Sequence, residues 1–377
     1  MARGSVPKKR IAKDGTVTWT AVIDVPPDPV TGKRRQRRLS APTKKDLEDL
    51  VRKELHSIGT GSYIEPARVT VREYLADWVA SIEASVRPTT FLRYRDICER
   101  QLAGALGGIK LATLTALHLR KAYAAWLKAG LAPATVELYH MILHRALDQA
   151  VKWQLIPRNP CDAADAPRPE RYEAKTWTAE QARAFLAGTA TDPLAALWRL
   201  ALLTGARKGE LLALRWADAD LDRGTLAIRR TLTRGPDGFT TGEPKSAAGT
   251  RSLALPPSCV AALRRHKAQQ AERRLKLGEL WQGTDLIFDR GDGGLLHPNV
   301  AYAAFRRHSD RLGLPPIRFH DLRHTAATLM LAEGIHPKIV QERLGHSSID
   351  MTLDRYSHVS LDMQREAADR LDKALGG

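Results

Sequence analysis

The chain has 377 residues, of which 43% are hydrophobic and 27% charged, and its formal net charge is +17. This length can supply two or three domains with separate cores, and the composition is that of a globular protein. The charge indicates a polyanion partner, whereas the lack of a signal peptide and of any apolar run of about 18 residues argues against a membrane protein.

The first predicted domain, residues 1–62, is a small β-sheet followed by a helix. Residues 16–24 alternate as a strand does, and after a Pro/Gly-rich turn residues 33–39 form a returning, basic strand. Thr43 is the expected cap of a helix with an apolar stripe at Leu47, Leu50, Val51 and Leu55. Up to Thr60 the segment has fourteen Lys and Arg against seven Asp and Glu. The basic strand could therefore lie in a DNA groove, or the segment could be a charged tail without a target.

The second predicted domain, residues 66–165, is almost entirely helical. Thr70 and Glu73 form a capping box before an apolar helical stripe, and more helices are expected at about 89–104, 115–129 and 133–153. This pattern predicts a four-helix bundle. Four arginines of the bundle could contact phosphates or form a solvated face: Arg87, Arg93, Arg95 and Arg100.

Residues 166–174 are predicted to be a linker, and residues 175–377 a third domain of helices with one short sheet. Thr178 and Gln181 form another capping box, and residues 224–232 and 251–255 are predicted strands on either side of a Gly/Pro-rich turn. From His297 onward the chain is expected to be helical. The predicted fold class is therefore multidomain and mainly α with small β-sheets.

The sequence lacks the usual nucleotide-binding and metal-binding signatures. There is no GxxxxGK[ST] motif and no convincing GxGxxG motif. His320 and His324 are four residues apart, as helical zinc ligands are, but Asp321 occupies the place of the expected glutamate and no third ligand is evident. Cys98, Cys161 and Cys259 fit neither a disulfide framework nor a CxxC site, so we expect no metal or cofactor and a reducing, cytoplasmic location.

A series of cationic and proton-transferring groups follows along the third domain. Arg207 comes just after a glycine where a helix can begin, and Lys245 lies in or beside the hairpin turn. His320 and Arg323 share one helical face, and Gly345 is an expected left-handed C-cap that fixes the direction of His346. Ten residues further on is Tyr356. With Ile349 and Leu353 it forms an apolar helical stripe, which by itself indicates a core tyrosine.

In this order, the motifs resemble the tyrosine recombinase family, also called the phage integrase family. They are T-G-x-R-x-G-E at 204–210, a hairpin lysine, H-x-L-R-H-T at 320–325, L-G-H-S-S at 344–348 and then a tyrosine. The helical segment 66–165 resembles the core-site DNA-binding domain of the family. Residues 1–62 resemble the arm-site-binding domain of phage and integrative-element integrases. The third domain would be the α+β catalytic domain with a C-terminal tail.

The resemblance implies a recombinase that cleaves and rejoins DNA through a 3′-phosphotyrosine link, and it implies a role for each residue of the series. A phenol has a pKa of about 10, so a tyrosine nucleophile needs a proton acceptor and a positively charged site for the phosphate. The implied catalytic set is Arg207 and Arg323 for the phosphoryl oxygens, Lys245 as general acid, His320 for proton transfer, His346 as hydrogen-bond donor and Tyr356 as nucleophile. The implied supporting residues are Glu210, Asp321 and His324, while Lys208 and Arg251 compete with Lys245 for the general-acid role.

The implied partners are double-stranded DNA at core and arm attachment sites, three further copies of the chain, a DNA-bending host factor and a directionality factor. The implied biology is integration and excision of a phage or integrative element, with the protein at the nucleoid when it is bound to DNA. A DNA-binding regulator without catalysis, a type IB topoisomerase-like enzyme and a chromosome-dimer resolvase remain alternatives. The additional basic N-terminal domain favours an element integrase.

Overall fold

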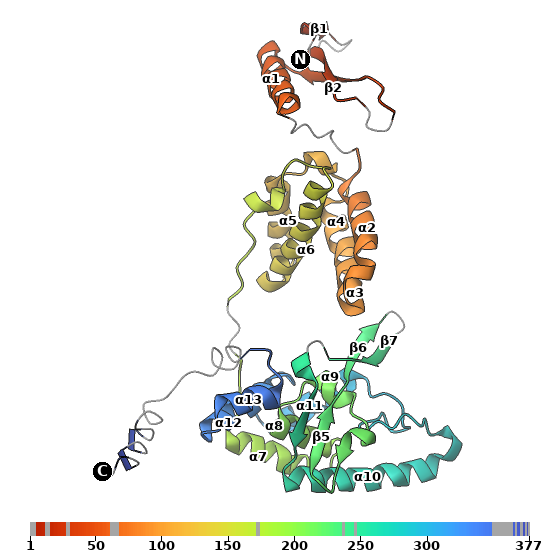
Figure 1. Cartoon of the computed structure of the whole chain (residues 1–377), viewed down its shortest axis with the longest axis vertical. Helices are drawn as coiled ribbons and strands as arrows, with labels where there is room; N and C mark the ends of the chain where they lie inside the picture. Colours follow the sequence, from red (N-terminus) through yellow and green to blue (C-terminus); the bar gives the residue numbers. More distant parts are fainter. Residues whose placement is uncertain are drawn as a thin grey trace. The chain divides into compact units, whose positions relative to one another are not determined.

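The computed structural model describes residues 5–11, 16–27, 31–60, 68–170, 174–235, 238–244 and 247–348, together with a few positions after residue 364. The chain divides into two compact units, Met1–Glu170 and Arg171–Gly377, whose helices and strands are labelled in Figure 1. The division falls within residues 166–174, the segment for which the sequence predicts a linker.

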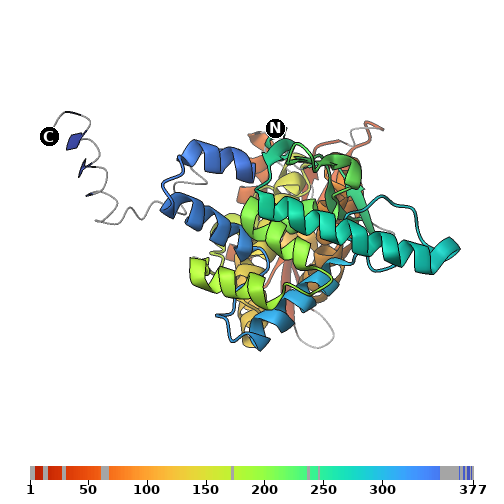
Figure 2. The ribbon, with the colours of Figure 1, turned by 90° about the horizontal axis from the view of Figure 1, so that it is seen from below.

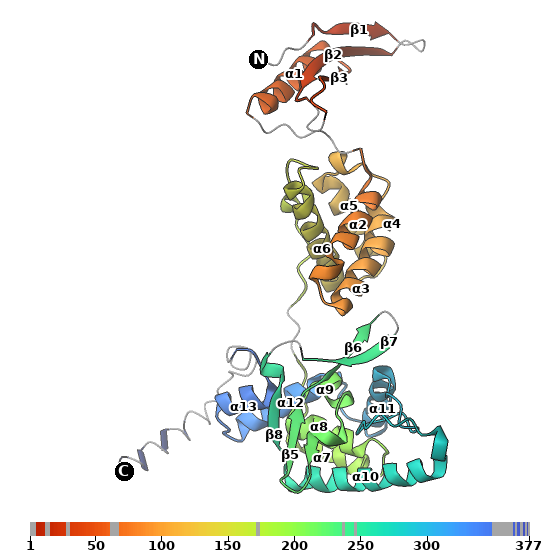
Figure 3. The ribbon, with the colours of Figure 1, turned by 45° about the vertical axis from the view of Figure 1, so that its right-hand side comes forward.

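The N-terminal part of the first unit is a three-stranded antiparallel sheet with one helix packed on it (Figure 3). Its elements are β1 (Lys8–Ile11), β2 (Val17–Val25), β3 (Arg35–Ala41) and α1 (Lys44–Gly59), with the strands in the order β1-β2-β3. Ile23 and Leu39 pack against Leu47 of α1. Thr43 accepts a hydrogen bond from the backbone N–H of Asp46, which confirms the predicted helix start. The sequence pattern does not predict β1, because all four of its residues are exposed and none marks a buried face.

The remainder of the first unit is helical and has its own core. Its main helices are α2 (Val71–Ile82), α3 (Pro88–Asp96), α4 (Ala103–Leu106), α5 (Ala116–Lys128) and α6 (Pro133–Lys152). A π-helical segment, Ile97–Leu102, joins α3 to α4, so the helix expected at 89–104 is confirmed as one continuous run. The capping box is also confirmed, since the backbone N–H of Thr70 donates to Glu73 Oε2 over 2.7 Å.

The second unit is built around α8, which contacts both α10 and α12. Figure 2 shows the length of α10 beside the other helices of this unit. The helices are α7 (Ala179–Gly188), α8 (Ala195–Thr204), α9 (Lys208–Leu212), α10 (Pro257–Leu277), α11 (Pro298–Arg311), α12 (Asp321–Ala332) and α13 (Pro337–Leu344). Buried aromatic rings of Phe185, Trp198, Phe305 and Phe319 fill its core.

The strands of the second unit form two small sheets rather than the single sheet expected. β4 (Ala219–Asp220), β5 (Thr225–Ile228) and β8 (Arg251–Ala254) make one sheet, and β6 (Thr231–Gly235) pairs with β7 (Gly238–Gly242) in the other. The strand predicted at 224–232 is therefore wrong in its continuity. The strand is interrupted at Arg230. The alternation places this residue on the buried face of the strand, where its side chain forms an ion pair with the buried Asp218 at 2.9 Å.

Two further predictions concern the helices. The capping box of Thr178 and Gln181 is confirmed at the start of α7, and the chain from His297 to Leu344 is mainly helical, as predicted. Of the helices that the structure describes, none has both the length and the apolar character needed to cross a bilayer. The predicted helical tail with Met363, Ala367, Leu371 and Leu375 lies almost wholly outside the described residues.

Candidate active site

The turn between α8 and α9 presents the first arginine of the site. Gly205 ends α8 in the left-handed region, with φ of +62°, and Arg207 is the N-cap of α9. The buried Thr204 hydroxyl donates to Leu200 O and accepts from the backbone N–H of Ala206. This pair of hydrogen bonds fixes the turn, and Arg207 therefore leaves it in a defined direction. Residue 207 begins a helix, as the sequence predicts.

Glu210 forms an ion pair with Arg207 and another with a second arginine, Arg251. Its carboxylate accepts from Arg207 Nη1 at 2.8 Å, from the Arg207 backbone N–H at 2.9 Å and from Arg251 Nη2 at 2.9 Å. Burial acts to raise the pKa of this carboxyl group, but the hydrogen bonds and charge of Arg251 and the donors of Arg207 outweigh it and lower that pKa. Glu210 is therefore ionised at neutral pH and can orient both guanidinium groups.

The start of α12 supplies His320 and the buried Arg323. Arg323 Nη1 donates to Gly205 O at 2.8 Å and to Leu344 O at 2.6 Å, so this side chain connects the α8–α9 turn to the end of α13. His320 is exposed at one side, but partial desolvation by its neighbours, followed by the positive charge of Arg323, lowers the pKa of its imidazole. The imidazole is consequently neutral at pH 7 and able to accept a proton.

The two supporting residues predicted on α12 are both buried. Asp321 accepts hydrogen bonds from the backbone N–H and the guanidinium of Arg318, which fixes the first turn of the helix. The ring of His324 lies 5.4 Å from that of His320, centroid to centroid, in an edge-on arrangement. These contacts are compatible with orienting roles, which remain predictions.

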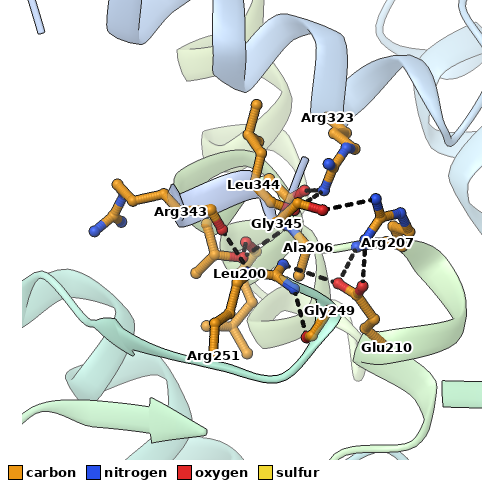
Figure 4. Close-up of polar contacts among 12 residues, drawn as sticks. Leu200, Ala206, Arg207, Glu210, Gly249, Arg251, Arg323, Arg343, Leu344 and Gly345 are labelled. Atoms are coloured by element: carbon orange, nitrogen blue, oxygen red, sulfur yellow. Dashed lines mark hydrogen bonds and ion pairs between the residues drawn. The ribbon is translucent and has the colours of Figure 1, made fainter. Parts of the chain in front are cut away.

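The C-terminus of α13 brings the separate motifs together (Figure 4). Its three consecutive carbonyls each accept from a different arginine: Arg343 O from Arg251 Nε at 2.7 Å, Leu344 O from Arg323 at 2.6 Å and Gly345 O from Arg207 Nη2 at 3.0 Å. These carbonyls have no partner within the helix and carry its negative dipole end, so cations are favoured there. We call this arrangement the three-arginine clamp.

His346 directly follows the clamp, at the turn that ends α13. Gly345 has φ of +67°, which confirms the predicted left-handed C-cap, and its backbone N–H donates to Glu342 O. The backbone N–H of His346 donates to Gln341 O at 3.1 Å, completing a Schellman turn. His346 is buried, and Gln341 Nε2 donates to its carbonyl. The direction in which the chain leaves α13 is therefore determined by hydrogen bonds on both sides of the turn.

Two of the predicted catalytic residues, Lys245 and Tyr356, lie outside the described residues. The described chain stops at Pro244 and resumes at Ala247, and it stops again after Ser348. Their roles remain predictions. The described part brings together Arg207, Glu210 and Arg323 and leads directly from the three-arginine clamp to His346.

The sequence does not predict the contacts that Arg251 and Thr204 make in the site. The sequence indicates Arg251 only as a competitor of Lys245, but its side chain is 8% exposed and is bound to Glu210. A lone basic residue at the start of a strand gives no signal of such a partner. Thr204 does carry a local signal, because a threonine in the last turn of a helix can donate to the carbonyl four residues earlier.

A group with ligand atoms close enough to hold a metal ion lies elsewhere, in the first unit. Among the described residues, His144, Asp148 and Asp162 have ligand atoms within 4.8 Å of one another. Both imidazole nitrogens of His144 already face a carboxylate, Nδ1 that of Asp148 and Nε2 that of Asp162. The observed contacts account for the cluster as a link between α6 and the segment that follows it.

The chain is similar to known protein families and to curated proteins. The model of the phage integrase family matches residues 175–362, and that of the phage integrase N-terminal SAM-like domain matches residues 70–127. A tyrosine recombinase XerC-like protein of Caldanaerobacter subterraneus subsp. tengcongensis is 26% identical over 97% of this chain and 98% of its own. The ICEBs1 integrase of Bacillus subtilis is 27% identical over 92% and 95%, respectively.

Solved structures share the fold. The integrase of the Tn1549 transposon, in complex with a circular intermediate DNA, has a TM-score of 0.68 at 22% identity, over 80% of this chain and 99% of that chain. Lambda integrase, as a tetramer bound to a Holliday junction, has a TM-score of 0.57 at 18% identity, over 94% and 96%.

The site has two guanidinium groups fixed on adjacent carbonyls and a neutral imidazole beside one of them, which suits the binding and transfer of a phosphoryl group. Since the phage integrase model covers residues 175–362 and relatives match almost the whole chain, the chain belongs to the phage integrase family and is a tyrosine-type site-specific DNA recombinase.

Proposed function

We propose that this recombinase integrates and excises a phage or integrative element, with Tyr356 as the nucleophile. Attack of the phenolic oxygen on a DNA phosphate forms a 3′-phosphotyrosine bond and releases a 5′ hydroxyl. Because the link retains the energy of the phosphodiester, the 5′ hydroxyl of another strand can reverse the step and rejoin the DNA without ATP. The three-arginine clamp is the observation that supports this proposal most directly, since it joins three of the ordered sequence motifs, those that contain Arg207, Arg323 and Gly345, at one point.

Each remaining residue has a distinct role in this proposal. Arg207 and Arg323 bind the non-bridging phosphoryl oxygens, where two guanidiniums suit the charge of the transition state. His320, whose pKa is lowered, takes the proton of the tyrosine, and Lys245 protonates the departing oxygen. His346 donates a hydrogen bond to a phosphoryl oxygen. Glu210 orients Arg207, while Asp321 and His324 orient the start of α12.

The test of this proposal is covalent trapping. The protein is incubated with nicked DNA that carries the attachment junction of its element, with EDTA present, and quenched with detergent. The expected result is a covalent adduct at one position of the junction, formed by the wild type and lost in Tyr356→Phe. Specific binding without an adduct, or an adduct that persists in Tyr356→Phe, would contradict the proposed nucleophile.

We further propose that the first unit binds DNA through both of its parts. In the N-terminal sheet, Lys8 pairs with Thr20 and Arg38 with Val22, on the face opposite the buried Ala21 and Ile23. That face is not covered by α1 and carries exposed cations, which fits the groove of an arm site. In the helical part, Arg93, Arg145 and Arg168 line an open hollow of about 1260 Å³ together with three carboxylates, and these arginines are proposed to contact the phosphates of a core site.

The assembly that acts is proposed to be a tetramer on two DNA duplexes, since recombining them requires four strand cleavages. The lambda integrase tetramer is a structural precedent with the same fold. A DNA-bending host factor and a directionality factor are further proposed partners, and the nucleoid is the proposed place of action. A chromosome-dimer resolvase would act in the same way but has no need of the basic N-terminal sheet.

A further inference from the structure

Arg251 is a buried cation to which the proposed chemistry gives no role. Each nitrogen of its guanidinium donates to a different segment of the second unit. Nε donates to Arg343 O at the end of α13 at 2.7 Å, Nη1 to Gly249 O at 3.0 Å and Nη2 to Glu210 Oε2 at 2.9 Å. A planar fork with fixed donor directions can hold three partners in this way, whereas the ammonium group of a lysine cannot.

Two of these segments adjoin residues with proposed catalytic roles. Gly249 ends the short helix Ala247–Gly249, which begins two residues after Lys245. Arg343 is the last-but-one residue of α13, three residues before His346. Arg251 therefore links the loop that carries Lys245 to the turn that presents His346.

Close packing reinforces this link. A Cβ atom added at Gly345 would lie 2.6 Å from Ala248 O, so the short helix lies directly against the Gly345 turn. A Cβ atom added at Gly249 would lie 2.5 Å from Pro244 Cβ, so the residues on the two sides of Lys245 are in contact. The base of the loop is thus closed and is fixed to α13.

We propose that Arg251 is a positioning residue for the general acid. It holds the Lys245 loop on the end of α13, so that Lys245 and His346 act on the same phosphate. This inference rests on the proposed role of Lys245. Proton transfer requires the acid within hydrogen-bond reach of the leaving oxygen, and a loop released from its base spends little time there. Loss of Arg251 should therefore slow the departure of the 5′ oxygen specifically.

The test uses two nicked DNA substrates that differ only in the bridging 5′ atom of the scissile phosphate, oxygen in one and sulfur in the other. A thiolate departs without protonation, so the sulfur substrate needs no general acid. We expect Arg251→Lys to cleave the oxygen substrate at least about tenfold more slowly than the wild type. On the sulfur substrate its rate should return to within about threefold of the wild type, as for Lys245→Ala, since the introduced lysine keeps a positive charge beside Glu210 and the phosphate-binding arginines are retained.

A matched control is Arg264→Lys, since Arg264 is an exposed arginine of α10 that pairs with the exposed Asp222. It should cleave both substrates as the wild type does. If Arg251→Lys is equally slow on both substrates while Lys245→Ala is restored by sulfur, the positioning role is wrong and the general-acid role stands. If sulfur does not restore Lys245→Ala, the general-acid role fails and the inference fails with it.

A second variant tests the same link without replacing a buried arginine. Gly249→Ala displaces Pro244 and thereby the base of the loop, while every arginine of the clamp is retained. Its thermal unfolding, measured beside that of Arg251→Lys, identifies a folding defect. We expect Gly249→Ala to show the same selective rescue by sulfur. A folded Gly249→Ala protein that is slow on both substrates, or on neither, would overturn the inference.

Discussion

At the scale of single residues, the site depends on one carboxylate held between two guanidinium groups. Glu210 has a side chain that is 2% exposed, and its partners Arg207 and Arg251 are 37% and 8% exposed. Burial of an ion pair is costly in itself, but removal of one partner costs more because it leaves buried charges without compensation. Glu210 therefore contributes both to the stability of the second unit and to the orientation of Arg207.

We expect Glu210→Gln to lower the free energy of unfolding by about 2 kcal/mol at pH 7, because hydrogen bonds to charged groups are lost. The pKa of Glu210 is lowered below its ordinary value of 4.5 in the folded protein. Its contribution is therefore complete above pH 4.5 and is lost as the pH falls through the folded pKa. Urea unfolding of the wild type and the variant between pH 7 and pH 3 measures this dependence.

Glu180→Gln is the control for that experiment, since Glu180 forms an exposed ion pair with Arg183 on α7. It should leave the urea midpoint close to that of the wild type, because solvent screens an exposed pair. A difference between wild type and Glu210→Gln that stays constant down to pH 3 would contradict the assignment of Glu210 as the ionised partner.

At the scale of elements, the end of α13 is the point at which the site is assembled. A left-handed glycine allows the chain to turn, and the three-arginine clamp satisfies the carbonyls that the helix leaves open. The turn has no room for a side chain, because a Cβ atom at Gly345 would lie 2.6 Å from Ala248 O and 2.9 Å from Arg251 Nη1. Both the backbone conformation and the packing therefore require glycine at this position.

We expect Gly345→Ala to bind DNA normally and to cleave it at least about tenfold more slowly, because the clash displaces the clamp and His346. Left-handed backbone strain alone should cost about 1–2 kcal/mol of stability. Gly334→Ala is a matched control: its φ is +71°, but its added Cβ would have no described atom within 4 Å. Cleavage by Gly334→Ala at the wild-type rate is expected, and equal loss in the two variants would mean that strain, rather than the clamp, determines the rate.

At the scale of the whole molecule, the net charge of +17 is shared among parts with different proposed DNA contacts. Each phosphate contact releases counterions, so affinity depends on salt in proportion to the number of contacts. The exposed face of the N-terminal sheet and the arginines of the hollow in the helical part are the two proposed sources of such contacts. Their contributions can therefore be measured one at a time.

We expect Arg38→Ala to weaken binding to arm-site DNA and to reduce the slope of log K against log salt by about 1, with core-site binding unchanged. Arg52→Ala, which removes an exposed arginine of α1 whose side chain is 80% exposed, is the control and should leave both unchanged. Fluorescence anisotropy with the two DNAs at several salt concentrations measures the effect. An unchanged arm-site slope in Arg38→Ala would exclude the uncovered sheet face as the DNA contact.

The features that the sequence determined by itself are those with causes within a few residues. Thr43 and Thr70 specify helix starts because each caps a backbone N–H three residues away, and Gly345 specifies a helix end because glycine tolerates a positive φ. The ordered motifs likewise indicated the family, and the phage integrase model matches the segment that carries them. The continuity of residues 224–232 was predicted wrongly, because the partner of Arg230 lies twelve residues away on another element.

Only the tertiary structure decided which groups meet at the site. Arg251 reaches Glu210 across 41 positions and Arg343 O across 92, while Arg207 and Gly345 O are 138 positions apart. Such pairs arise because helices α8, α12 and α13 and strand β8 pack in one unit, and neither periodicity nor spacing contains that information. For this reason the sequence identified the residue types that handle a phosphate, whereas packing determined that three arginines hold the end of one helix.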